Sequence, residues 1–63
     1  MIVNFYKKPV RGFNTNVTLV SSKNIDIIPQ KGTFVEYHGQ HFQVERIHFD
    51  LANCVYNVYM VRV

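Results

Sequence analysis

The sequence predicts an all-β fold, a small barrel or roll of five to six antiparallel strands that forms a single domain over residues 1–63. Val, Ile, Thr, Phe and Tyr dominate the 63 residues, and these side chains pack well on a pleated sheet. Alanine occurs once and leucine twice, whereas a helical domain uses both heavily. No apolar stripe follows the i, i+3, i+4, i+7 spacing of an amphipathic helix.

The first half of the chain contains two predicted strands and a third apolar segment. Residues 2–8 alternate between two faces and stop at Pro9, which has no backbone donor for a ladder. A turn leads into a second strand over about 14–21, and the polar run 21–24 predicts another turn. The apolar segment 25–28 is predicted as a third strand or an extended arm.

The second half predicts a hairpin whose second arm is a long, bent strand. Residues 33–37 alternate, and the turn 38–40 contains a glycine that can adopt positive φ. The next strand, 41–50, changes the phase of its apolar positions partway. One extra residue near 45–46 restores the register, which predicts a β-bulge that bends the strand toward a closed barrel.

The last predicted strand, 54–63, is apolar on both faces, although a half-exposed antiparallel strand alternates apolar with polar residues. Two interpretations follow. Either the strand is central and covered on both faces, or one face binds a second copy or a partner protein. Aromatic, methionine and arginine side chains are enriched in protein interfaces. The candidate interface residues are Tyr6, Phe34, Tyr56, Met60 and Arg62.

The overall balance of residues also favours protein binding. Hydrophobic residues make up 48% of the chain and charged residues only 17%, against about 25% charged in an average domain. A chain of 63 residues has too much surface per residue to bury all of this apolar content. We therefore expect a protein partner, a homodimer, or both.

The net charge of +3 supports an alternative function, the binding of single-stranded nucleic acid. The basic surplus lies in the first third of the chain, where basic and aromatic residues interleave. Small barrels use such a combination to neutralise phosphates and stack bases. The candidate residues for this alternative are Lys7, Lys8, Arg11, Phe13 and Lys23.

Catalysis and cofactor binding are not expected. The four acidic residues form no paired arrangement, and no Gly-rich phosphate loop is present. Cys54 begins an apolar strand, a position typical of a small hydrophobic side chain rather than a nucleophile. His41 and His48 lie more than roughly 20 Å apart along one straight strand, too far for a shared zinc site. We predict no enzyme activity, metal, cofactor or small-molecule substrate.

A cytoplasmic protein without a membrane segment is expected. No apolar run approaches the roughly 20 residues that cross a bilayer. In residues 1–8 the charge follows the apolar residues, which is the reverse of a signal peptide. The single cysteine excludes an internal disulfide.

The segment IPQKGTFVEYHGQHFQV, residues 28–44, resembles the pattern of small SH3-like β-barrel proteins, many of them encoded by bacteriophages. In these proteins a Pro-x-x-Gly turn precedes a strand with a buried valine, a glycine hairpin follows, and an aromatic-x-Val strand comes next. The matching residues here are Pro29, Gly32, Val35, Gly39, Phe42 and Val44. The family usually has an acidic residue where this chain has Thr33.

The resemblance implies an SH3-like barrel and a small accessory protein in the cytoplasm of a host cell. Such a protein binds and blocks a host macromolecule, for example a defence protein or a nucleic-acid-processing protein. The resemblance carries over no catalytic residue.

Overall fold

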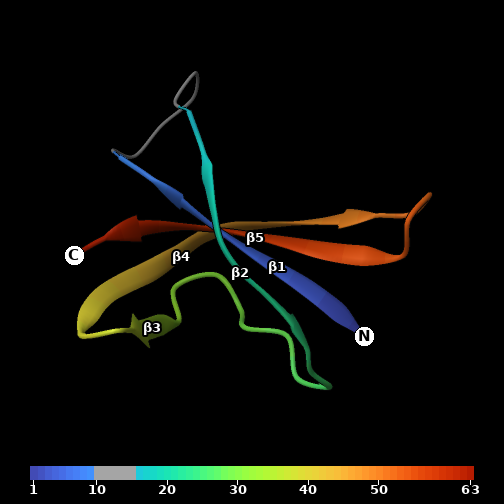
Figure 1. Ribbon diagram of the computed structural model, residues 1–63, viewed down its shortest axis with the longest axis horizontal. Helices are drawn as coiled ribbons and strands as arrows, with labels where there is room; N and C mark the ends of the chain where they lie inside the picture. Colours follow the sequence, from blue (N-terminus) through green and yellow to red (C-terminus); the bar gives the residue numbers. More distant parts are fainter. Residues whose placement is uncertain (10–15) are drawn as a thin grey trace.

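The computed structural model describes residues 1–9 and 16–63, which form five β-strands and no helix (Figure 1). The strands are β1 (Ile2–Lys8), β2 (Thr18–Asn24), β3 (Phe34–Tyr37), β4 (Gln40–Asp50) and β5 (Val55–Arg62). All five belong to one sheet with the order β2-β1-β5-β4-β3, and this sheet is curled into a half-barrel. The predicted all-β class is confirmed.

The prediction that all strand pairs are antiparallel is wrong at the centre of the sheet. β1 and β5 are parallel, whereas the pairs β1–β2, β3–β4 and β4–β5 are antiparallel. A parallel pair needs a long crossover connection, and here the chain from β2 to β4 provides it. Alternation of apolar and polar residues does not encode strand direction, so the sequence pattern contains no signal for this pair.

β2 lies later in the chain than predicted. The sequence predicts this strand over 14–21, and residues 14–15 lie outside the described residues. The observed strand includes the polar run 21–24, which was predicted as a turn. β2 pairs only with β1 within the described residues, so one side of it faces solvent and tolerates polar residues. Segment 25–28 forms no strand and is the predicted extended arm, from which Ile25 and Ile28 pack against the core.

The two predicted distortions of the β3–β4 region are both present. His38 and Gly39, the central residues of the hairpin turn, have φ values of +50° and +78°. Positive φ at both positions is the geometry of the two-residue turn that matches strand twist. In β4 the register with β5 shifts between Val44 and Arg46, which leaves Glu45 as the extra residue of a β-bulge.

The core lies on the inner face of the curled sheet. Its buried residues come from β1, β4 and β5 and are at most 2% exposed: Val3, Phe42, Val44, Val58 and Met60. β5 lies between β1 and β4, at the centre of the strand order. The central position predicted for the last strand is therefore observed, whereas its binding of a second copy or a partner protein stays a prediction.

The turn between β4 and β5 is stabilised by Asp50. Asn53 donates to its carboxylate twice, from the side-chain amide at 2.9 Å and from the backbone N–H at 3.2 Å. Both hydrogen bonds favour the charged carboxylate, the side-chain bond most strongly, and hold the pKa of Asp50 below its ordinary value of 3.8. Because the pKa is lower in the folded state, the stabilisation is present above pH 3.8 and is lost as the pH falls through the folded-state pKa.

We therefore expect an NMR titration of the Asp50 carboxyl carbon to have its midpoint below 3.8. Replacing Asn53 by alanine removes the side-chain donor and should move the midpoint up toward 3.8. A midpoint at or above 3.8 in the unmodified chain would show that these hydrogen bonds do not form in solution.

Candidate functional site

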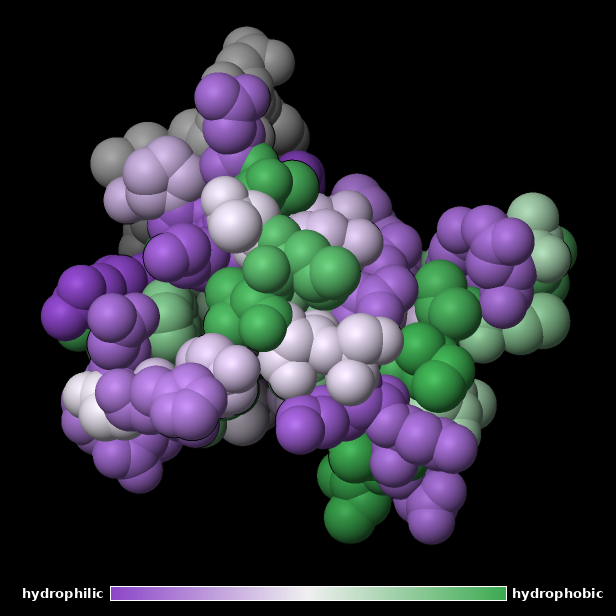
Figure 2. Space-filling view, in the orientation of Figure 1, coloured by the Kyte–Doolittle hydropathy of each residue, from purple (hydrophilic) through white to green (hydrophobic). Residues whose placement is uncertain are grey.

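The open side of the half-barrel holds an apolar groove. β2 and β3 are the two edge strands of the sheet, and they form opposite walls of this groove, which has a volume of about 100 Å³. This groove is lined by Val20, Ser21 and Lys23 of β2, by Val35 and Tyr37 of β3, and by Phe5 and Met60 on its floor. Figure 2 shows hydrophobic side chains gathered at the middle of the face that β2 crosses.

The two walls of the groove do not pair with each other. No Cα atom of β2 lies within 8 Å of a Cα atom of β3. Hydrogen-bonded neighbours in a sheet lie only about 4.8 Å apart. Within the described residues, β2 pairs only with β1 and β3 only with β4, so each strand has one unpaired edge. The half-barrel therefore has an open seam with apolar side chains beneath it.

A second, larger hollow of about 380 Å³ lies at one end of the barrel and is called the basic hollow below. It is lined by Lys7, Lys8 and Pro9 of the first segment, Asn16 and Thr18 before and in β2, Gln40 and Phe42 of β4, and Arg62. Lys7 and Arg62 are exposed, and none of these described lining residues is acidic. The hollow can therefore attract an anion, with amide and hydroxyl groups available as hydrogen-bond donors.

Lys8 differs from the other basic residues because its side chain is buried. Its ammonium donates to Glu45, and the two side chains are 1% and 18% exposed. Glu45 is the extra residue of the β4 bulge, which takes it out of the ladder with β5. The structure thus commits Lys8, a candidate for phosphate binding, to an internal ion pair.

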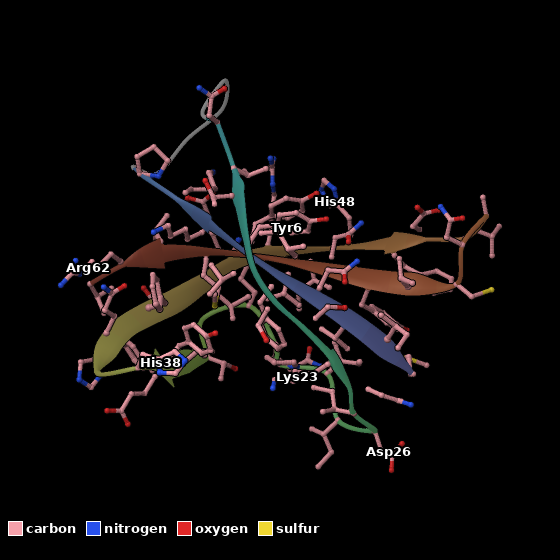
Figure 3. All side chains as sticks on the ribbon, viewed as in Figure 1. Tyr6, Lys23, Asp26, His38, His48 and Arg62 are labelled. Atoms are coloured by element: carbon pink, nitrogen blue, oxygen red, sulfur yellow. The ribbon has the colours of Figure 1, made fainter. Side chains whose placement is uncertain are left out.

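Tyr6, a candidate interface residue, lies on the outer face of the sheet. Its ring stacks on Tyr59 with a centroid distance of 5.3 Å and an angle of 19° between the planes. The Arg46 guanidinium lies 5.4 Å from the Tyr59 ring centroid. Figure 3 shows Tyr6 and His48 on the same side of the molecule. Because Tyr6 is half-buried among these groups, it contributes to a cross-strand ladder rather than to the groove.

The other candidate interface residues do not form one surface. Phe34 is 70% exposed on edge strand β3, and Arg62 is exposed in the basic hollow. Tyr56 is half-buried against Phe49, with ring centroids 4.8 Å apart. Met60 is 1% exposed and belongs to the core, where it forms part of the floor of the groove. Burial removes its side chain from any flat contact surface.

The candidate nucleic-acid residues are also divided. Lys7 lies in the basic hollow and Lys23 at the groove, and both are exposed. In Figure 3, Lys23 and Arg62 lie well apart, so the groove and the basic hollow are separate sites. Arg11 and Phe13 lie outside the described residues.

No cluster of metal-ligating side chains is found within residues 1–9 and 16–63. No three His, Cys, Asp or Glu side chains of these residues gather closely enough to hold a metal ion. Cys54 is exposed in the β4–β5 turn with a positive φ of 54°, and its Sγ donates to the Leu51 carbonyl at 3.6 Å. No described helix has the length and apolar character needed to span a membrane.

Sequence reasoning missed the groove, although two of its lining residues, Lys23 and Met60, were candidates for other sites. Val20 and Val35 were each assigned to a strand, but nothing in their spacing shows that the two strands would be opposite edges of one sheet. The polar composition of residues 21–24, which was interpreted as a turn, is the signal that could have indicated an edge strand. Compared with known proteins, the chain matches no family model, no curated protein and no solved structure.

Proposed function

We propose that this half-barrel is a non-enzymatic binding protein that holds part of a partner protein in the groove. One observation carries the proposal: an apolar groove lies between two strand edges that are unpaired within the described residues. Burial of apolar surface and pairing of open edges are the two interactions that such a site offers. The protein would act in stoichiometric amounts, by occupying or holding its partner.

The finer form of this proposal is an SH3-like accessory protein of the bacteriophage type that blocks a host protein in the cytoplasm. The small curled sheet with a bulged, bent β4 supports the SH3-like assignment. The exposed, unpaired thiol of Cys54 supports a reducing compartment. A defence protein or a nucleic-acid-processing protein is the class of target that the resemblance suggests.

The proposal is tested with two aspartate variants of neighbouring β2 residues. Val20 lines the groove, whereas Leu19 is 54% exposed and does not. Immobilised unmodified protein and both variants are incubated with nuclease-treated lysate of the source cells. We expect the unmodified protein and Leu19→Asp to retain the same protein, and Val20→Asp to lose it, because a carboxylate in an apolar groove must be desolvated.

Circular dichroism establishes that both variants are folded, and light scattering of the same samples measures self-association. A homodimer that Val20→Asp dissociates would identify a second copy as the occupant of the groove. Retention of the captured protein by Val20→Asp at the level of Leu19→Asp would contradict the proposal.

Binding of single-stranded nucleic acid is a second candidate function, carried by the basic hollow. Lys7 and Arg62 line it, and no acidic residue is among the described residues that line it. We expect labelled oligonucleotides to shift in a gel, with binding that weakens steeply as salt rises. The double variant Lys7→Glu with Arg62→Glu should make the plot of log affinity against log salt concentration shallower, by about two in the magnitude of its slope. Lys23→Glu, at the groove, is the matched control, and no shift at micromolar protein would remove this candidate.

A further inference from the structure

We infer that the partner segment in the groove is an extended strand that pairs with the open edge of β2 and closes the half-barrel toward β3. This inference rests on the proposed function, because it names how the partner occupies the same site. It is drawn from three properties of the seam: the direction of the backbone groups of β2, the separation of the two edges, and the chemistry of the lining.

The backbone of β2 presents hydrogen-bonding groups to the seam. The Ile25 N–H donates to the Met1 carbonyl at 2.9 Å, which marks a hydrogen-bonded pair at the start of the β1–β2 ladder. Hydrogen-bonded and non-bonded pairs alternate along an antiparallel ladder. With Val3 opposite Lys23, the Lys23 backbone bonds to β1, and the N–H and C=O of Ser22 point away from β1. Ser22 therefore offers both a donor and an acceptor to an incoming strand.

The separation of the two edges excludes direct pairing of β2 with β3. Direct pairing of β2 with β3 would bring their backbones to about 4.8 Å, and one strand between them requires about 9.6 Å. The Cα atoms of the two edges are more than 8 Å apart. The seam is too wide for direct pairing and is compatible with an inserted strand.

The lining of the groove defines the side chains of that strand. Alternate residues of a strand point to opposite faces, so every second residue of the partner segment would point into the groove. Val20, Val35 and Tyr37 make apolar side chains favourable at these positions. Lys23 is exposed at the β2 wall, and none of the described residues that line the groove is acidic, so an acidic residue of the partner suits the position beside Lys23.

A partner protein fits this description better than a second copy of the chain. The spare extended segment, residues 25–28, already packs Ile25 and Ile28 against its own core. β2 itself contains Lys23 and no acidic residue, so two β2 edges would bring basic residues together rather than opposite charges. The occupant is therefore an extended segment of another protein in which apolar residues alternate with polar ones and the groove-facing position beside Lys23 is acidic.

The experiment uses a short synthetic peptide in which valines alternate with threonines, and in which one glutamate replaces the groove-facing valine that would lie beside Lys23. The control peptide has lysine in place of this glutamate. Two variants of Ser22 are compared. Both lose the Oγ hydrogen bond to Asn4, which is 2.7 Å long, but only Ser22→Pro also loses the outward N–H. Proline is tolerated on an edge strand where its nitrogen faces solvent, and Ser22→Ala is the matched control.

We expect the glutamate peptide to bind the unmodified chain and Ser22→Ala, and to protect the Ser22 amide from hydrogen exchange. Ser22→Pro should bind it roughly tenfold more weakly than Ser22→Ala, because a ladder hydrogen bond is lost and the ring obstructs the incoming backbone. The lysine peptide should bind more weakly than the glutamate peptide, and Lys23→Ala should abolish that difference.

Failure of this inference is distinguishable from failure of the proposed function. Strand pairing is refuted if Ser22→Pro binds the glutamate peptide as well as Ser22→Ala does and the Ser22 amide of the unmodified chain gains no protection from hydrogen exchange. This holds even if Val20→Asp still fails to retain the protein captured from the lysate. If the unmodified chain forms a dimer that Ser22→Pro dissociates, a second copy is the occupant and the inference is overturned. If Val20→Asp changes neither peptide binding nor capture, the proposed function fails as well.

Discussion

Replacing Met60 by aspartate should unfold the domain. The Met60 side chain is 1% exposed and packs in the core. A carboxylate at this position would lose its hydration among apolar core side chains, which costs several kcal/mol. A domain of this size rarely has more than about 3–5 kcal/mol of total stability, so the penalty equals or exceeds it. Met60→Leu keeps the volume and should cost less than about 1.5 kcal/mol.

Phe34→Asp is the control, because Phe34 is 70% exposed on β3. An exposed substitution of this kind should change the free energy of unfolding by no more than about 0.5 kcal/mol. Circular dichroism during urea denaturation measures both variants. A cooperative transition for Met60→Asp with a midpoint near that of the unmodified chain would show that Met60 is not a core residue, and Met60 would again be a candidate interface residue.

The position of Met60 illustrates what alternation along a strand can and cannot predict. The period of two correctly places Tyr56, Val58 and Met60 on the same face of β5. It does not say which face is internal, because β5 is apolar on both sides. That choice depends on the strands beside β5, and one of them, β1, pairs with it in parallel from the far end of the sequence.

Features with a local cause were predictable. β1 is observed with its predicted bounds, because Pro9 removes the next backbone donor. The hairpin turn at Gly39 and the bulge at Glu45 follow from positive φ and from a phase change, both of which are visible in a few adjacent residues. The SH3-like assignment stays a prediction.

The candidate site was not predictable to the same degree, because it is built from segments that are distant in sequence. The groove needs Val20 and Val35 on opposite edges of one sheet, a relation that depends on the order of all five strands. Lys8 was assigned to a basic surface because only its charge was visible. The bulge that turns Glu45 toward it determines its actual role.

We expect the Lys8–Glu45 pair to show an asymmetric response to substitution. Lys8 is 1% exposed and Glu45 is 18% exposed. Glu45→Leu leaves an ammonium group in the interior without its carboxylate and should cost about 3–5 kcal/mol, enough to unfold most of the population. Lys8→Met leaves a carboxylate that still reaches water, so its cost should be smaller, about 1–3 kcal/mol.

The double variant Lys8→Met with Glu45→Leu should recover much of the stability lost by Glu45→Leu, because replacing a whole buried ion pair by apolar groups is often neutral or stabilising. Urea denaturation of the four proteins gives the double-mutant cycle, and we expect a coupling free energy of about 1–3 kcal/mol. Additive costs would mean that the two charges do not meet in solution. Lys8 would then be available to bind phosphate, and the basic hollow would have a third cation beside Lys7 and Arg62. Attraction of an anion to the hollow depends on how many of the basic residues in the hollow are not already neutralised by an acidic residue of the same protein.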